Sequence, residues 1–170
     1  MDERKLRQHL FSETAHLFAA LDGVMVPDLP NRLFDGNVPN ECLWTGDLTP
    51  DLVYTAPYLV ALSPDSKFTD WVFAEALGKH WGIFIRSRHS MLETRNHFRR
   101  LISVYDERGN PMRFRFYDPR VLRKFLPTCN PGELKTLFGK ASAIFTEADD
   151  AEHLLRFEVG PDKLVVTELD

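Results

Sequence analysis

The feature that most restricts the fold is an uninterrupted apolar run near the middle of the chain. Residues 80–86 have the sequence His-Trp-Gly-Ile-Phe-Ile-Arg, which combines β-branched and aromatic side chains. A run of this length and composition is typical of a buried strand inside a sheet. The sequence therefore predicts a central strand at 80–86, with other elements packed around it.

Further strands and helices are predicted on both sides of this run from hydrophobic periodicity and turn residues. The predicted strands are 16–21, 41–45, 57–62, 103–106, 112–117, 143–146, 154–159 and 164–168. The predicted helices are 2–13, 27–34, 67–79, 90–101 and two short ones that begin after Asp118 and Asn130. Strands alternate with helices first and hairpins dominate the end. This order favours an α/β or α+β fold, with helices on a mixed sheet in a single compact domain, 1–170.

Helix starts are marked by capping residues at three places. Ser90 and Glu93 have the spacing of a capping box, and Asp118-Pro119 and Asn130-Pro131 each place a cap before a proline. In the helix after Ser90 we expect the core-facing residues to be Leu92, Phe98, Leu101 and Ile102. Between the strands 103–106 and 112–117, residues 107–111 predict a hairpin turn. In its second strand, apolar side chains alternate with Arg113, Arg115 and Tyr117. One face of the strand is therefore apolar and the other cationic.

The chain lacks the sequence patterns of common reactive sites. Its six histidines and two cysteines form no His-Glu-x-x-His or Cys-x-x-Cys motif, so we expect no metal site. It has no Gly-x-Ser-x-Gly nucleophile motif and no glycine-rich phosphate loop. Cys42 and Cys129 lie far apart, and we expect two buried, reduced thiols. We therefore expect no catalytic residue, no cofactor and no enzymatic activity.

Charge is distributed unevenly along the chain. The net charge is −4, yet residues 79–124 hold twelve Lys and Arg against four Asp and Glu. Such asymmetry indicates an interaction surface, unless the arginines pair internally with Glu93, Asp106 and Asp118. We expect Arg88, Arg95 and Arg99 to share one helix stripe. The candidate partner-binding residues are Arg86, Arg88, Arg95, Arg99, Arg115, Tyr117 and Arg120.

Five segments, taken in order, resemble the domain of unknown function 4123 family over about residues 14–158. They are His-Leu-Phe-Ala-Ala-Leu-Asp at 16–22, Pro-Tyr-Leu-Val-Ala-Leu at 57–62, Trp-Gly-Ile-Phe-Ile-Arg-Ser at 81–87, Arg-Phe-Arg-Phe-Tyr-Asp-Pro-Arg-Val-Leu at 113–122 and Phe-Leu-Pro at 125–127. That family includes adaptor chaperones of the bacterial type VI secretion system. The resemblance implies a non-catalytic protein that binds a cognate toxic effector and helps load it onto the VgrG spike.

The resemblance also points to positions that recur in the family. Of these, Arg86, Arg115, Tyr117 and Arg120 are expected at the surface. Plain structural roles are open for the others, which are Asp22, Tyr58, Trp81, Asp118 and Pro119. Many family members carry a further, mostly helical C-terminal lobe, which these 170 residues do not include.

Two other functions are compatible with the arginine-rich segment. One is an enzyme that clamps a small anionic substrate between Arg86 and Arg115. The other is a polyanion binder, although nucleic acid is an unlikely partner for a chain with a pI of about 5.9. Residues 1–8 contain no apolar signal segment, and no run reaches the roughly 18 apolar residues of a membrane span. We therefore expect a cytoplasmic protein without membrane contact.

Overall fold

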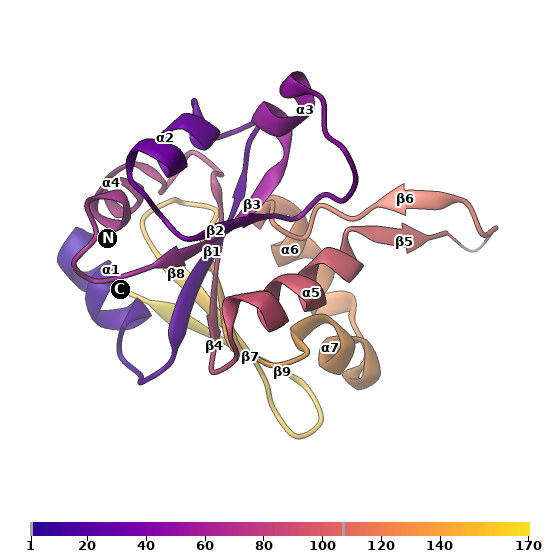
Figure 1. Ribbon diagram of the computed structural model, residues 1–170. Coiled ribbons are helices and arrows are strands. Elements are labelled where there is room, and N and C mark those ends of the chain that lie inside the picture. Colours follow the sequence, from indigo (N-terminus) through magenta and orange to yellow (C-terminus); the bar gives the residue numbers. More distant parts are fainter. Residues whose placement is uncertain (1, 107) are drawn as a thin grey trace.

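A computed structural model describes residues 2–106 and 108–170 and is built around one twisted sheet (Figure 1). The sheet has seven strands in the order β2-β3-β1-β4-β7-β8-β9. Their bounds are β1 His16–Asp22, β2 Asn40–Cys42, β3 Pro57–Leu62, β4 Gly82–Ser87, β7 Ala141–Glu147, β8 Leu154–Val159 and β9 Leu164–Leu169. The predicted central strand is thus confirmed, because β4 is the fourth strand of the seven.

The α+β class is confirmed, but the sheet is antiparallel throughout the described residues and not mixed. The reason lies in the position of β1. Both β3 and β4 are antiparallel to β1, so they run in the same direction, and a helical segment joins them as in a parallel crossover. Because β1 lies between them, the two parallel strands never pair with each other.

Helices cover both faces of the sheet and create two cores. On the first face lie α1 (Glu3–Leu10), α2 (Leu29–Asp35) and α4 (Lys67–Glu75). On the second lie α5 (Met91–Leu101), α6 (Pro119–Phe125), the 3-10 turn η1 (Leu126–Thr128) and α7 (Pro131–Phe138). Successive side chains of a strand point to opposite faces. In β4, therefore, Phe84 joins the first core while Ile83 and Ile85 join the second.

The capping signals are confirmed, whereas some helix details differ from expectation. Ser90 and Glu93 form both hydrogen bonds of the capping box, and Asp118 caps α6. Leu92 is exposed and does not face the core, because α5 turns Thr94 and Phe98 toward the sheet. The short helix α3 (Pro50–Thr55) was not predicted; it buries no residue and so lacks a hydrophobic signal. None of the helices in the described residues has the length and apolar content that crossing a membrane requires.

A two-stranded arm projects from the body of the protein (Figure 1). It consists of β5 (Ser103–Tyr105) and β6 (Pro111–Arg113), which pair only with each other. The predicted hairpin is therefore present, but its second strand ends at Arg113 instead of Tyr117. At the tip the Asp106 carboxylate accepts hydrogen bonds from the backbone N–H groups of Arg108 and Asn110. Glu107, part of the predicted turn, lies outside the described residues.

We predict that Gly82→Ala lowers the free energy of unfolding by about 3 kcal/mol. A Cβ at this position would lie 2.1 Å from the backbone oxygen of Ala20 on the adjacent strand, which cannot move without disturbing the sheet. Chemical denaturation measures the change. Gly132→Ala is the matched control, since its Cβ would meet only the side-chain oxygen of Asn130. Equal stability of the two variants would contradict this account of β4.

Candidate functional site

Two buried carboxylates and two arginines meet at the end of β1. The Arg115 Nη2 atom lies 2.8 Å from an Asp22 oxygen and 3.3 Å from an Asp118 oxygen. Arg120 binds Asp118 with two parallel hydrogen bonds, at 3.0 Å and 2.8 Å. Both carboxylates are buried, while each arginine side chain is about half exposed. We call these four residues the Asp22–Asp118 cluster; it unites four of the positions expected from the family resemblance.

The backbone holds both carboxylates of the cluster in place. Asp22 is the last residue of β1; its N–H donates to the Trp81 carbonyl at 2.8 Å, and its carboxylate accepts from the Val24 N–H at 2.9 Å. Asp118 precedes α6, where its carboxylate accepts from the N–H of Arg120 at 3.0 Å. Pro119 occupies the first turn of that helix. The sequence thus fixes each carboxylate locally, and the fold brings them together.

Electrostatics keep Asp118 ionised. Burial alone would raise the pKa of Asp118, but hydrogen bonds from Arg120 and the charges of Arg120 and Arg115 outweigh it, and the pKa lies below its usual value. The hydrogen bond to Asp118 raises the pKa of Arg120. Burial and the nearby charge of Asp22 raise the pKa of Tyr117. A general acid or base works best with a pKa near the working pH. These shifts favour a fixed charge cluster over proton transfer.

Arg86 was expected at the surface, and that prediction is wrong. Its side chain is 1% exposed, and its guanidinium lies over the Phe145 ring. It donates to the His9 carbonyl at 2.6 Å, to Ser12 Oγ at 3.1 Å and to Glu13 at 2.6 Å. Arg86 therefore ties the segment after α1 to the sheet. A charged residue in a strand is expected to be exposed. The sequence could not show that Arg86 is buried, because its partners lie 73 or more positions away.

Three other expected positions are buried and structural. Tyr117 was predicted at the surface but is buried beside Phe116, so this prediction is also wrong. Tyr58 is buried, and its hydroxyl donates to the Val53 carbonyl at 3.0 Å. Trp81 is buried and packs on Trp71 in the first core. None of the three presents its ring to a partner.

The expected stripe of Arg88, Arg95 and Arg99 is present only in part, because Arg88 lies outside the helix. Arg88 precedes α5, is exposed and forms no hydrogen bond or ion pair within residues 2–106 and 108–170. Arg95 pairs with Glu41 at 2.8 Å, and Arg99 donates to the Cys42 carbonyl at 2.5 Å. These two arginines hold the short edge strand β2 against α5. The spacing in the sequence was compatible with one stripe, but the helix begins after Arg88.

Arg86 and Arg115 also cannot clamp one small substrate. Arg86 is paired in register with Leu17 near the start of β1, whereas Arg115 binds Asp22 at its end. Five strand residues separate these points, which is roughly 16 Å at 3.3 Å per residue. Moreover, Arg86 is buried, and both of its terminal nitrogens donate to groups of the chain itself. The enzyme hypothesis therefore loses the pair of residues on which it was based.

Exposed apolar and cationic side chains gather around the arm. Tyr105 is 71% exposed, and Met112, which belongs to the expected apolar face of its strand, is 50% exposed. At the base of the arm Phe114 packs on the exposed Phe125, with ring centroids 4.7 Å apart. The arm surface, as we define it, consists of Tyr105, Met112, Arg113, Lys124 and Phe125. Because Met112 pairs with Val104 and Tyr105 with Pro111, Tyr105 and Met112 lie on opposite faces of the arm.

The cations of the arm surface are free of carboxylate partners. Arg113 lies over the Trp44 ring at 4.5 Å and does not continue a cationic strand face with Arg115, which turns back to Asp22. Neither Arg113 nor Lys124 forms an ion pair within the described part of the chain. A shallow hollow of about 580 Å³ lies beside Lys124 and Phe125 on α6. In the sequence, this surface is indicated by the predicted hairpin. No third strand pairs with that hairpin in the described structure.

Metal binding and thiol chemistry find little support in the described residues. No group of three or more His, Cys, Asp or Glu that could hold a metal ion occurs there. Cys42 and Cys129 are free and only partly buried, so the expectation of fully buried thiols is wrong. Burial raises the pKa of both thiols, which lowers the fraction of reactive thiolate.

Comparison with known proteins gives one match. The model of the family described as Domain of unknown function (DUF4123) matches residues 17–136. The chain belongs to this family. The matched segment runs from β1 into α7. It therefore contains both the Asp22–Asp118 cluster and the whole arm surface. No curated protein and no solved structure matches the chain.

Charge reversal in the cluster is expected to damage the fold. Arg115→Glu with Arg120→Glu would place four carboxylates together, two of them buried. We therefore predict that the double variant loses about 3 kcal/mol or more in the free energy of unfolding. Urea denaturation measures it, with Arg4→Glu/Arg88→Glu as an exposed double control. A stable cluster variant would show that these ion pairs are dispensable.

The cluster also predicts an acid dependence of stability. Because the pKa of Asp118 is lowered in the folded state, its contribution is present above the ordinary value of 3.8 and is lost as the pH falls below it. Asp118→Asn removes the charge and should cost about 1–2 kcal/mol at neutral pH. Denaturation curves should give the same free energy of unfolding for the unaltered protein and for Asp118→Asn once the pH is well below 3.8. A difference that persists unchanged at low pH would contradict this assignment.

Proposed function

We propose that this DUF4123 protein is a non-catalytic cytoplasmic adaptor that binds a cognate secreted effector and helps load it onto the VgrG spike of a type VI secretion system. Family membership supports the class of protein. The observation that carries the proposal is the arm surface, where large apolar side chains lie exposed beside cations without carboxylate partners. Such a surface is suited to binding another protein.

The chemistry of the arm surface matches that of protein interfaces. Aromatic residues, Met and Arg are enriched at the centre of interfaces, where a few of them supply most of the affinity. Tyr105 and Met112 provide apolar anchors on opposite faces of the arm. Arg113 provides charge on the face of Tyr105, and Lys124 provides charge beside Phe125 at the base. The expected partner segment therefore has apolar residues flanked by acidic ones.

The shape of the arm supports the same function. An isolated two-stranded hairpin is only marginally stable in water. The arm keeps its place through its base, where Phe114 N–H donates to the Ile102 carbonyl at 2.8 Å and Arg115 binds Asp22. Neither β5 nor β6 pairs with a strand of the seven-stranded sheet. A partner that packs on the arm would complete its hydrophobic contacts.

The charges disfavour nucleic acid as the partner. Of the cationic candidates, Arg86, Arg95, Arg115 and Arg120 pair with the chain's own carboxylates. Of the other candidates, Arg99 donates to a backbone carbonyl, and the chain as a whole carries a charge of −4. A binder of phosphate backbones needs a continuous basic surface. The arm surface instead combines few charges with exposed rings.

The test is capture of the effector encoded beside this protein. We predict that Tyr105→Ser with Met112→Ser weakens capture at least about tenfold, because each removed anchor contributes on the order of 1 kcal/mol or more. Co-purification and titration calorimetry measure the change, and circular dichroism checks folding. The control is Phe34→Ser, because Phe34 is 84% exposed on α2, away from the arm (Figure 1). Unchanged capture by the folded double variant would exclude the arm surface as the binding site.

A further inference from the structure

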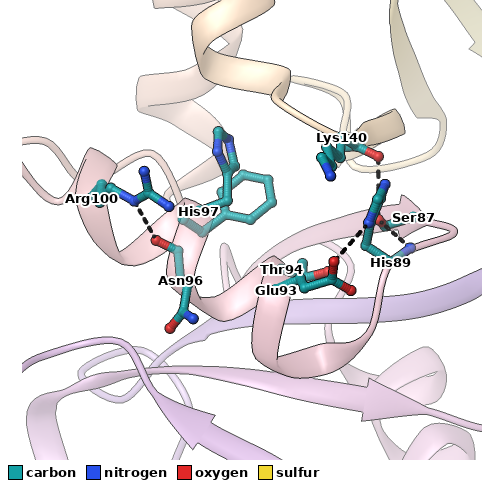
Figure 2. Close-up of a pocket in the computed structure, with 10 residues that line it drawn as sticks. Ser87, His89, Glu93, Thr94, Asn96, His97, Arg100 and Lys140 are labelled. Carbon is teal, nitrogen blue, oxygen red and sulfur yellow. Dashed lines mark hydrogen bonds and ion pairs between the residues drawn. The ribbon is translucent and has the colours of Figure 1, made fainter.

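A separate hollow lies between α5 and the turn that joins α7 to β7. Its cavity volume is about 250 Å³. Figure 2 shows His89 and Lys140 on one side of it and His97 and Arg100 on the other. Sites for drug-sized ligands and cofactors generally occupy about 300–1,000 Å³. The hollow therefore suits one small chemical group and not a nucleotide.

Two cations at this hollow form no ion pair with any of the described residues. Lys140 donates no hydrogen bond from its side chain and forms no ion pair within the described residues. Arg100 donates one hydrogen bond from Nε to the Asn96 carbonyl at 3.0 Å, but its guanidinium likewise meets no carboxylate there. Both residues are exposed on one side and line the hollow on the other. Both residues therefore border the space that a small anion would occupy.

The one acidic residue of the hollow is already occupied. The hydroxyl and the backbone N–H of Ser90 donate to Glu93 at 2.7 Å and 3.0 Å, and His89 lies 3.3 Å from its other oxygen. These contacts lower the pKa of Glu93 to about 2. Glu93 therefore remains a fixed negative charge that caps α5. The lysine, the arginine and the glutamate together leave a single positive charge, which matches a monoanion better than a phosphate dianion.

Thr94 supplies a hydrogen-bond donor that the chain does not use. Thr94 is 5% exposed, and its hydroxyl has no hydrogen-bond partner. It lines the hollow, and a buried hydroxyl without a partner is unfavourable. An oxygen atom of a ligand in the hollow would accept its hydrogen bond.

The wall beside Thr94 is already formed. The His97 Nε2–H donates to the Leu137 carbonyl at 2.9 Å, which fixes the ring. Gly139 makes room for that ring, because a Cβ there would lie 2.3 Å from its Cε1 atom. A glycine is also favoured by the positive φ of 55°. The hollow is therefore part of the fold and does not require a ligand to shape it.

We propose that this hollow binds a carboxylate group, with Lys140 and Arg100 supplying the charge and Thr94 a hydroxyl donor. The inference goes beyond the proposed function and does not depend on it. The carboxylate has two possible sources, which are an acidic side chain of the partner protein and a free small acid. Both offer the same chemistry to the hollow, and the experiment distinguishes them.

The probe is N-acetylglutamic acid α-amide, in which the side-chain carboxylate is the only charge. Titration of the full chain, followed by amide resonances in NMR, should shift Thr94 and Lys140 in a saturable way. Lys140→Gln and Thr94→Val should each weaken binding by about tenfold, because each removes a charge-assisted hydrogen bond. Lys163→Gln, an exposed lysine in the β8–β9 turn, is the matched control and should bind as the unaltered protein does.

The uncharged N-acetylglutamine amide should produce no saturable shift, and inorganic phosphate should bind more weakly than the carboxylate. Equal binding of the glutamine probe, tighter binding of phosphate, or no shift at Thr94 and Lys140 would overturn the proposal. If capture of the effector persists while these shifts are absent, the carboxylate site is wrong and the adaptor function stands.

The Lys140→Gln variant also identifies the source of the carboxylate. If Lys140→Gln weakens effector capture and the probe competes with the effector, the hollow takes an acidic side chain of the partner. If capture is unchanged and the probe binds the complex as well as the free protein, the ligand is a free small acid. Either result supports a carboxylate site, because both require the probe to bind at Thr94 and Lys140.

Discussion

The ion pair between Arg115 and Asp22 determines where the functional parts of the molecule lie. It joins residues 93 positions apart and anchors the segment between the arm and α6 to the end of β1, next to the centre of the sheet. Because Asp22 and Asp118 are both buried, each needs a cation; Arg115 comes from this segment and Arg120 from the start of α6. The direction in which the arm leaves the body and the position of α6 both follow from this contact.

The arginines and lysines of the middle third fall into two groups with different roles. Arg86, Arg95, Arg99, Arg115 and Arg120 bind carboxylates or carbonyls of the chain and stabilise the fold. Arg88, Arg100, Arg113 and Lys124 have no carboxylate partner among the described residues. The excess of positive charge is therefore smaller than the sequence indicates, and it is available at separate places. Two of these places are the arm surface and the hollow beside α5.

The sheet provides a rigid base for both places. Helices on each face bury two separate cores, and β1 between β3 and β4 links them through the middle of the sheet. The arm and the hollow both lie on segments that follow β4, where the chain leaves the sheet before returning as β7. Binding residues are often found on such connections, because a rigid scaffold positions them without constraining their side chains.

The sequence by itself determined what depends on near neighbours. The periodicity of 16–21, 57–62 and 80–86 predicted strands β1, β3 and β4, and the caps at Ser90, Asp118 and Asn130 predicted helix starts within one residue. These features arise from contacts a few residues apart. The order of the five segments likewise predicted the family.

Only the tertiary structure decided which charges are free and which strands pair. Arg86 and Tyr117 looked exposed because polar groups usually are, yet partners from α1 and the second core bury them. The strand pairing became antiparallel because β1 lies between two strands that run in the same direction. Burial and pairing depend on residues distant in sequence, and neither periodicity nor composition records which distant residue a side chain will meet.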